Sequence, residues 1–583
     1  MANTQVFPPV IERIEDWPIY RMLNDRKRLV EELIEVTYQE LIETHGEADT
    51  DIILETIYKE RQRIRTEPWK VDPPDERSFW GSIKNKLLRN SLDKEELASS
   101  ITNEALLKTI IRRYAEEIVG TFKKPTFLFA RRFLTFFFKR LLNAAASRNF
   151  RRFFNSKYQV VDRLQVRGEV EKLRSLMTKG TVVLVPTHFS NLDSILIGYM
   201  MDAVLGLPSF SYGAGLNLYN TGYTAYFMNR LGAYRVDRRK KNPIYLQTLK
   251  SFSDISIRRG VNTLFFPGGT RERSGAMETR LKMGLLGTAV QAQRHNLQHG
   301  DGRKVFIVPL ITGYNSVLEA NFLIDQHLKQ IGKEQYIVRK DDFNSFRKLI
   351  RFTWNFFAKG SKVMFSFGKP MDVLGNFVTA EGVSLDRHGR PVAMRDYFVS
   401  DHQITTDKQR EQEYTRLLAE RIVERFYKEN IVLASHLIAY AAFNLFRYHH
   451  PKLDIFGLLR VPPEDFVFDR EELLDVVGQL RAELLERAGA GKVKVADRIR
   501  DEPEAILQSG LNRLGRYHSE LPLVELPDGQ LMSQDLRVLF YYHNRLENYG
   551  LHQTITWPAV EAEAPVIGLS DLDLAAALYP EKM

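Results

Sequence analysis

The sequence predicts an α/β protein whose mostly parallel sheet is preceded and followed by helical regions. Between about residues 166 and 375, short β-branched and apolar runs alternate with stretches of helical period, as expected for strands joined by crossover helices. The flanking residues carry charged amphipathic patterns that are typical of helices. The chain has 583 residues, of which 44% are hydrophobic and 27% are charged. These proportions are globular, and the length predicts more than one domain.

Residues 1–120 are predicted to be a helical N-terminal region. Residues 21–44 and 92–119 are charged and amphipathic, and a Pro-Pro turn within residues 69–76 separates them. The first residues lack a basic stretch followed by an apolar one, so we expect no signal peptide.

Residues 121–165 form the most basic part of the sequence. Residues 121–157 hold ten Lys or Arg residues and no acidic residue, and ten is also the net charge of the whole chain. Basic pairs recur every eight residues among many phenylalanines, so much of the charge could share one helical face. We predict an amphipathic helix on an anionic membrane surface, where each basic side chain contributes about 1 kcal/mol. The predicted membrane-contact residues are Arg131, Arg132, Phe133, Phe137, Lys139 and Arg140.

Two alternatives remain open for this basic segment. It could be a core helix with a solvated basic edge, or it could bind nucleic acid through its basic and aromatic side chains. No recognition motif accompanies the segment, so we expect no nucleic-acid partner.

The later part of the chain passes from strands to helices. Residues 166–375 are predicted to form the sheet domain, residues 376–455 a loop and helical extension, and residues 456–583 a mostly helical region. Residues 431–446 are the longest apolar run, but polar residues interrupt it and it is short for a bilayer, so we predict a buried helix. The predicted strands cover residues 181–185, 262–266, 305–310 and 363–367.

Several classes of chemistry are excluded by what the sequence lacks. There is no cysteine, which removes disulfides, thiolate metal sites and cysteine nucleophiles. There is no H-E-x-x-H motif and no Gly-rich loop of the nucleotide-binding types, so we expect neither a metal nor a bound cofactor. The net charge of +10 predicts an anionic partner.

His188 and Asp193 follow the first predicted strand with the spacing H-x-x-x-x-D. A carboxylate that bonds one imidazole nitrogen fixes the tautomer and raises the basicity of the other nitrogen, which can then deprotonate a hydroxyl. Five residues correspond to about 500° on a helix, so the two side chains meet only if a turn precedes the helix. The same spacing occurs at residues 402–407 and 449–454, but only the first pair follows a buried strand, where α/β sheets bind ligands.

Two basic loops follow later strands. The first comes after Gly232 and a short apolar run, and the second, residues 267–275, reads P-G-G-T-R-E-R-S-G and is called the Gly-Arg loop below. Guanidinium groups bond phosphate oxygens bidentately, and glycines let a ligand approach the backbone. These loops therefore predict a phosphorylated ligand. The candidate phosphate-binding residues are Arg238, Gly269, Thr270, Arg271 and Arg273.

In this order, the blocks resemble the glycerolipid acyltransferase superfamily over residues 166–375. His188 and Asp193 match its catalytic H-x-x-x-x-D block, and residues 266–275 match its third block, usually F-P-E-G-T-R-S-R-S-G. The second block is matched by Gly232, Val236 and Arg238, and the fourth by Val308, Pro309 and Leu310. G-Y-N-S-V-L-E at residues 313–319 and S-F-G-K-P-M at residues 366–371 further resemble the long bacterial membrane-bound glycerol-3-phosphate acyltransferases and their dihydroxyacetone-phosphate relatives.

The resemblance implies transfer of a fatty acyl group from acyl-CoA or acyl-acyl carrier protein to the 1-hydroxyl of glycerol 3-phosphate, a step of phospholipid synthesis. His188 would be the general base and Asp193 its orienting partner, while Arg238, Arg271 and Arg273 would hold the phosphate of the polyol acceptor. Neither a metal nor a covalent acyl-enzyme is needed. The protein would be peripheral or monotopic on the cytoplasmic side of the cell membrane.

Other functions stay open beside this one. The acceptor could be lysophosphatidate or dihydroxyacetone phosphate, or the chain could be a catalytically degenerate membrane-binding protein. One departure from the family pattern motivates both alternatives: Gly268 stands where the third block has a Glu that is thought to place the polyol hydroxyls, and Glu272 stands where Ser is usual. We hypothesise that Glu272 partly substitutes for the missing carboxylate.

Overall fold

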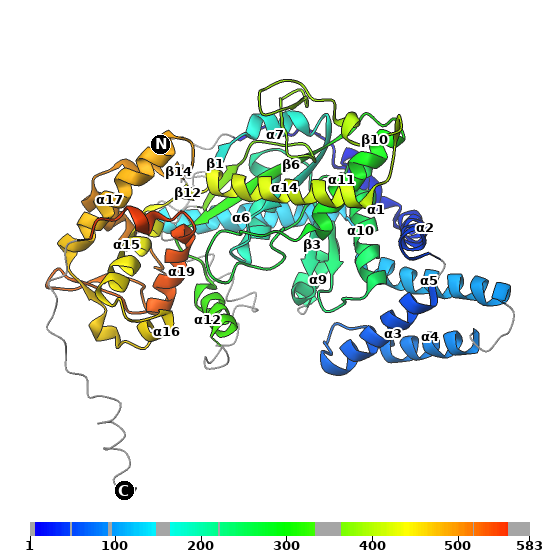
Figure 1. Cartoon of the computed structure of the whole chain (residues 1–583), viewed down its shortest axis with the longest axis horizontal. Helices are drawn as coiled ribbons and strands as arrows, with labels where there is room; N and C mark the ends of the chain where they lie inside the picture. Colours follow the sequence, from blue (N-terminus) through cyan, green and yellow to red (C-terminus); the bar gives the residue numbers. More distant parts are fainter. Residues whose placement is uncertain are drawn as a thin grey trace, which may run out of the picture.

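The computed structural model describes residues 6–46, 49–90, 96–146, 164–219, 222–332, 363–516 and 518–557. Its central sheet lies between the N-terminal helices at one end of the molecule and the C-terminal helices at the other (Figure 1). The predicted α/β class with helical flanks is confirmed.

The N-terminal region is helical, as the amphipathic patterns predict. Apolar side chains of these helices form a buried cluster with helix α10 (Pro243–Arg258), which attaches them to the sheet domain. Trp80 and Tyr114 are among the fully buried side chains of this cluster. The helices are η1 (Ile14–Asp16), α1 (Pro18–Asn24), α2 (Arg26–His45), α3 (Asp49–Thr66), α4 (Glu76–Asn90) and α5 (Glu96–Ile118).

The sheet has seven strands in the order β1-β7-β6-β2-β5-β3-β4. Five neighbouring strands, from β6 to β4, run parallel, whereas β7 pairs antiparallel with β6 and carries β1 parallel to itself. Parallel strands bring their carboxyl ends to one edge, where ligands bind in α/β sheets. The strands are β1 (Leu164–Gly168), β2 (Gly180–Pro186), β3 (Ser211–Gly215), β4 (Ala233–Val236), β5 (Thr263–Leu264), β6 (Lys304–Tyr314) and β7 (Val363–Phe367).

The structure has strands at all four predicted places, as β2, β5, β6 and β7. Strand β6 is longer and β5 is shorter than the pattern suggests. The β1 and β3 strands were not predicted, because their sequences, L-Q-V-R-G and S-Y-G-A-G, are mixed or glycine-rich and lack an apolar run. Backbone pairing with β7, and with β4 and β5, makes them strands.

The helices of the domain cover the sheet on both sides and connect its strands. Helix α10 packs on α11 and on α2, and α14 (Lys408–Glu429) packs on α11 and β6. The other helices of this part are α7 (Val170–Leu176), α8 (Leu192–Tyr199), η4 (Met200–Val204), η5 (Leu216–Tyr219), α9 (Gly222–Met228), α11 (Met283–Gln298) and α12 (Ala320–Ile331).

The C-terminal region is built around helix α15 (Ala434–His449). The prediction of a buried helix at residues 431–446 is confirmed, since every residue from Ala434 to Phe446 is buried. Helices α17 (Arg470–Gly489), α18 (Pro503–Leu511) and α19 (Leu536–Glu547) pack around it. Their buried residues form one continuous cluster with those of the sheet, so this region shares the core of the sheet domain.

Short elements complete the second half of the chain. Residues 379–406, in the loop part of the predicted extension, contain only short strands and one 3₁₀ turn. These elements are β8 (Phe377–Val378), β9 (Ser384–Leu385), η7 (Met394–Tyr397), β10 (Val399–Ser400), β11 (Gln403–Ile404), β12 (Ile431–Val432), α16 (Ile455–Leu458), η8 (Pro463–Asp465), β13 (Val467–Phe468), β14 (Lys494–Val495), η9 (Asp497–Arg500), β15 (Val524–Glu525), β16 (Leu531–Met532) and η10 (Leu551–Thr554).

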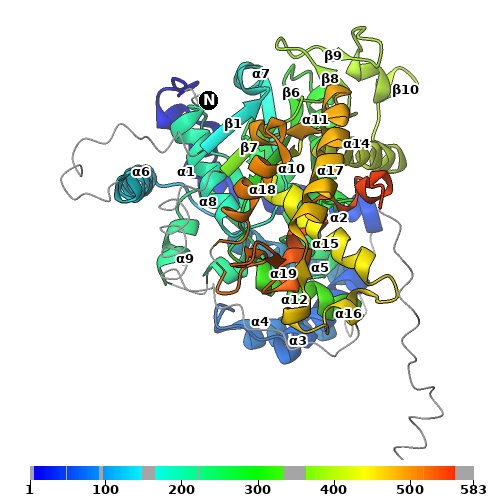
Figure 2. The same cartoon turned by 90° about the vertical axis from the view of Figure 1, so that its left-hand side faces the viewer.

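The basic segment contains the predicted helix, α6 (Lys124–Ala146), which Figure 2 shows end-on at the margin of the molecule. Phe129, Phe133 and Phe136 are exposed, and Arg132 lies on the same face because these positions are spaced by three or four residues. Arg131 instead forms an ion pair with Asp202 of η4 at 2.9 Å. The side chains of Phe137, Lys139 and Arg140, and residues 147–163, lie outside the described part. Within the described ranges, no helix is long and apolar enough to cross a membrane.

Candidate active site

The loop after β2 brings His188 and Asp193 together. Residues 187–191 are non-helical and α8 begins at Leu192, so the turn that the spacing required is present. His188 Nδ1 lies 2.9 Å from Asp193 Oδ2. Asp407 and Asp454, from the other two H-x-x-x-x-D segments, instead accept backbone N–H bonds at the starts of α14 and α16.

Asp193 is fully buried and is held by several donors. Its Oδ2 also accepts the backbone N–H groups of Phe189 and Ser190, at 2.8 and 2.9 Å, and its Oδ1 accepts the hydroxyl of Tyr314 at the end of β6. Bonds to the charged form stabilise a buried carboxylate. An ionised Asp193 requires that His188 Nδ1 carry the proton, which leaves Nε2 as the free base.

His188 is held from a second side by the Gly-Arg loop and by the residues that flank it. Its ring stacks on Phe266, with the centroids 3.9 Å apart. The backbone N–H of Glu272 donates to the carbonyl oxygen of His188 at 2.7 Å, and the N–H of His188 donates to Oε1 of Glu278 at 3.3 Å. The His188 loop and the Gly-Arg loop are therefore one connected structure, joined because β2 and β5 are neighbours in the sheet.

Arg271 is anchored to this structure through Glu319. Its guanidinium lies 3.3 Å from Oε1 of Glu319, which is fully buried and also accepts the Ser190 hydroxyl and the Asn191 N–H at 3.0 and 2.9 Å. Burial raises the pKa of Glu319, and the charge of Arg271 opposes that rise. Glu319 therefore connects the cation of one loop to the loop that carries His188.

Arg238, beyond the end of β4, lies close enough to Arg271 for their charges to interact. The pKa of Arg238 is lowered by partial loss of hydration and by the neighbouring Arg271. Two like charges held near one another favour an anion between them. Arg239, beside it in sequence, is instead bound to Asp72 and Asp237, so only one member of the Arg-Arg pair faces the site.

The remaining candidate phosphate-binding residues are divided. Gly269 adopts a positive φ of 80°, and the side chain of Lys282 lies over it, since a Cβ there would stand 2.6 Å from the Lys282 ammonium nitrogen. Thr270 follows in the same turn and is partly exposed. Arg273, however, reaches α12 and donates to Gln330 at 3.1 Å, so the structure does not place it with Arg271 and Arg238.

Helix α19 supports the Gly-Arg loop from behind. Asn544 donates to the Ser274 carbonyl at 2.9 Å. The buried guanidinium of Arg545 lies 4.2 Å from the ring centroid of Phe189 and donates to the carbonyl of Thr312 at 3.0 Å. The C-terminal region thus helps to build the site, although no motif in its sequence indicates this.

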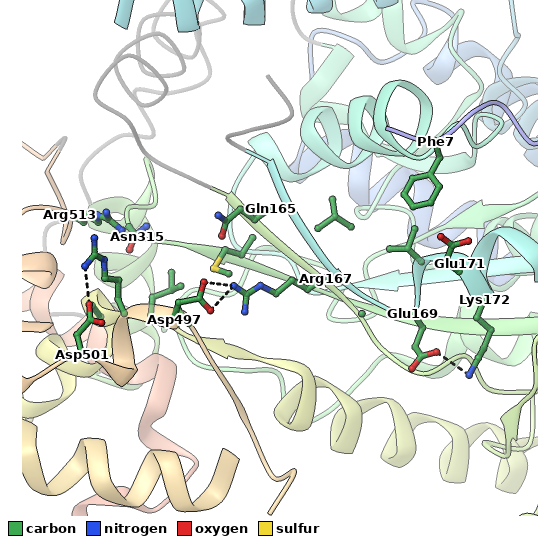
Figure 3. Close-up of a pocket in the computed structure, with 18 of the residues that line it drawn as sticks. Phe7, Gln165, Arg167, Glu169, Glu171, Lys172, Asn315, Asp497, Asp501 and Arg513 are labelled. Carbon is green, nitrogen blue, oxygen red and sulfur yellow. Dashed lines mark hydrogen bonds and ion pairs between the residues drawn. The ribbon is translucent and has the colours of Figure 1, made fainter. Parts of the chain in front are cut away.

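A hollow with a volume of about 1080 Å³ lies at the β1 edge of the sheet, beside the C-terminal region (Figure 3). Two of its labelled cations are paired within the protein: Arg167 with Asp497 at 3.2 Å, and Lys172 with Glu169 at 3.0 Å. None of the predicted catalytic or phosphate-binding residues lines it, so we place the chemistry at His188.

Residues 167–313 match the family model described as Acyltransferase. This part of the chain is similar to acyltransferases. The matched residues begin in β1 and end in β6, and they include His188, Asp193 and the whole Gly-Arg loop. The expected resemblance to acyltransferases is thereby confirmed for this part of the chain.

The domain is similar to proteins named glycerol-3-phosphate acyltransferase. Relatives from Shewanella sp. (strain ANA-3) and Shewanella amazonensis are 24% identical over 327 and 330 residues, which is 55% of this chain and 35% of each relative. A relative from Aeromonas hydrophila is 28% identical over 228 residues, 39% of this chain and 26% of the relative. The chain thus spans about a third of the length of the curated relatives it matches.

Sequence reasoning missed four residues of the candidate site: Tyr314, Glu319, Glu278 and Arg545. Tyr314 and Glu319 lie in the G-Y-N-S-V-L-E segment, so its resemblance was a usable signal. Glu278 follows the Gly-Arg loop without a motif, and Arg545 reaches the site only through the packing of α19.

Among the described residues, no group of three or more His, Asp or Glu could hold a metal ion.

Proposed function

We propose that this protein transfers a fatty acyl group from an acyl thioester to the 1-hydroxyl of glycerol 3-phosphate. The observation that carries the proposal is the buried His188–Asp193 pair at the carboxyl edge of an acyltransferase domain, with two arginines of neighbouring loops close by. The names of the relatives, glycerol-3-phosphate acyltransferase, support glycerol 3-phosphate as the acceptor.

In the proposed mechanism, Nε2 of His188 takes the proton of the acceptor hydroxyl while the hydroxyl oxygen attacks the thioester carbonyl. Asp193 keeps the proton on Nδ1 and stabilises the imidazolium that forms. Arg238 and Arg271 hold the acceptor phosphate and so position the hydroxyl. The oxyanion needs hydrogen-bond donors, which we expect among backbone N–H groups of the His188 loop or the Gly-Arg loop. The imidazolium then returns its proton to the departing thiolate.

The donor and the location belong to the same proposal. The donor is acyl-CoA or acyl-acyl carrier protein, and the product enters phospholipid synthesis. A product with a fatty acyl chain partitions into lipid, so the site should operate on a membrane surface. The exposed face of α6, formed by Phe129, Arg132, Phe133 and Phe136, offers the aromatic and basic groups that suit an anionic interface. We place the protein on the cytoplasmic side of the cell membrane as a peripheral or monotopic protein.

The test is an acyl-transfer assay with the purified chain and anionic vesicles. Each donor is offered with glycerol 3-phosphate, dihydroxyacetone phosphate or lysophosphatidate, and His188→Ala is compared with His449→Ala. His449 also stands five residues before an aspartate, but its Nε2 bonds Glu472. Both residues are far along the chain from His188. We expect transfer to glycerol 3-phosphate that falls at least about 10²–10⁴-fold in His188→Ala and is unchanged in His449→Ala.

Other outcomes of this assay would change the proposal. Preference for dihydroxyacetone phosphate or lysophosphatidate would keep the mechanism and replace the acceptor. Vesicle binding without transfer to any acceptor would support the degenerate membrane-binding alternative.

A further inference from the structure

The carboxyl group of Glu278 lies against the point where a side chain at position 268 would begin. A Cβ built on Gly268 would lie 3.4 Å from Cγ of Glu278 and 3.5 Å from its Oε1. These are ordinary van der Waals distances, so a Cβ at 268 would touch the carboxyl, and we expect a longer side chain there to compete with it for space. The glycine and the glutamate therefore fit each other, although they are separated by ten positions in the chain.

One oxygen of this carboxyl is used and the other is not. Oε1 accepts the N–H of His188 at 3.3 Å, whereas Oε2 has no hydrogen-bond partner among the described residues. Glu278 is only 4% exposed. A buried carboxyl oxygen without a partner is costly, so a ligand hydroxyl that reached Oε2 would find an unused acceptor there.

Glu272 is not available for the same task. Its Oε1 accepts the N–H and the hydroxyl of Ser274, at 3.2 and 2.7 Å, which turns its carboxylate back onto its own loop. The hypothesis that Glu272 substitutes for the carboxylate missing at 268 is therefore less favoured by the geometry than a role for Glu278.

We propose that Glu278 is the acceptor-specificity residue of this site: Oε1 positions the His188 loop, and Oε2 hydrogen-bonds the non-reacting middle hydroxyl of the polyol phosphate. The inference rests on the proposed function, because the hydroxyl it recognises belongs to the proposed acceptor. The carboxyl accepts the backbone N–H of His188, so a hydroxyl that it holds would lie beside the loop that carries the proposed base. A site built to bond a hydroxyl discriminates strongly against a ligand that lacks it.

The experiment compares the binding of two ligands by calorimetry. One is glycerol 3-phosphate and the other is propane-1,3-diol monophosphate, which lacks the middle hydroxyl. At about pH 8, where Glu278 is ionised in the folded chain, we expect the unaltered chain to prefer glycerol 3-phosphate about tenfold to a hundredfold, the range that a hydrogen bond to a charged group supplies. Glu278→Met should lose this preference, Glu278→Gln should keep part of it, and Thr279→Ala, an exposed neighbour, should keep all of it.

A second pair of variants tests the exchange of positions. Gly268→Glu alone forces two carboxyls into one space and should bind both ligands poorly. Gly268→Glu combined with Glu278→Ala frees that space, so the preference for glycerol 3-phosphate should return. Recovery in the double variant also guards against misfolding as the cause of the losses.

The outcomes separate this inference from the proposed function. If the unaltered chain transfers acyl groups but does not discriminate between the ligands, or if Glu278→Met discriminates as well as the unaltered chain, the inference is wrong and the function stands. If discrimination depends on Glu278 but no acceptor is acylated, the function is wrong and the inference stands. If neither is seen, both are wrong.

Discussion

At the scale of single residues, the buried polar groups decide how His188 behaves. Asp193 is satisfied by one imidazole N–H, two backbone N–H groups and the hydroxyl of Tyr314. A buried network with every member bonded is rigid, whereas one missing donor leaves an expensive unpaired charge. The orientation of the base thus depends on residues that are not part of the H-x-x-x-x-D motif.

Tyr314→Phe removes one donor from Asp193 and keeps the shape of the ring. We expect kcat to fall about tenfold to a hundredfold with the acceptor KM unchanged, because the loss acts on the base and not on the phosphate. Steady-state kinetics with varied acceptor measure this. Tyr414→Phe, which removes a hydroxyl bonded to the Tyr397 carbonyl, is the control. An unchanged kcat would show that Asp193 does not need Tyr314.

Glu278 should also give the stability of the protein a pH dependence. Burial raises its pKa from the ordinary 4.5 to about 7, helped by Glu272 and opposed by the His188 N–H and Arg545. Between these pH values the unfolded chain ionises at this residue while the folded chain stays protonated, so stability is lost as the pH rises. The free energy of unfolding of Glu278→Gln, relative to that of the unaltered protein, should therefore rise by up to about 3 kcal/mol between pH 4.5 and 7. Above pH 7 the difference should stay constant.

Urea unfolding of both proteins at matched pH values measures this difference, and comparing the two cancels the other titrating groups. A difference that does not change with pH would mean that Glu278 ionises in the folded protein as it does in water.

At the scale of elements, helix α19 and the Gly-Arg loop form one unit. Asn544 bonds the Ser274 carbonyl, and Gly275 lets the loop pass directly against the helix. Gly275 has a φ of 87°, and a Cβ there would lie 2.1 Å from the carbonyl oxygen of Tyr541. Only glycine fits both the conformation and the contact.

Gly275→Ala should push the loop away from α19 and so move Arg271 and the support of His188. We expect a large loss of activity and a loss of stability above the cost of about 1 kcal/mol for the conformation alone. Gly389→Ala is the matched control, since Gly389 has a φ of 79° and open space around it. Thermal unfolding and the transfer assay compare the two. Equal effects would show that the contact with α19 is unimportant.

At the scale of the whole molecule, α6 links the proposed membrane surface to the phosphate site. Residues just before α6 are bonded to the turn that leads into β4: Thr121 N–H to the Asn229 carbonyl at 3.1 Å, and Lys123 N–H to the Arg230 carbonyl at 2.9 Å. Strand β4 ends just before Arg238. The helix with the exposed aromatic face is therefore attached to the element that positions one arginine of the site.

Replacing Phe129, Phe133 and Phe136 together by Ser should weaken binding to anionic vesicles at least tenfold, because each buried Phe contributes about 1.5–3 kcal/mol. Sedimentation with phosphatidylglycerol vesicles measures the binding. A double replacement of Leu54 and Tyr58 by Ser is the control, since both are exposed, 46% and 68%, on the distant α3. If binding stays at full strength in the triple variant, another surface contacts the membrane.

The sequence by itself determined the α/β class, the helical flanks, the buried helix α15 and the identity of the His188–Asp193 pair. Each of these is written in local patterns: periodicity, apolar runs, or a motif placed after a strand. Tertiary structure alone decided that Arg273 turns to α12 while Arg271 stays with Arg238, because guanidinium direction depends on partners such as Gln330 and Glu319.

Tertiary structure also decided the roles of Glu278 and Arg545. Neither lies in a motif, and each reaches the His188 loop only after the chain has folded, Glu278 through the space left by Gly268 and Arg545 through the packing of α19. Contacts between residues far apart in sequence follow from how the core closes, and no local pattern records them. The sequence therefore specifies the His188–Asp193 pair, and the packing of distant segments specifies how that pair is held.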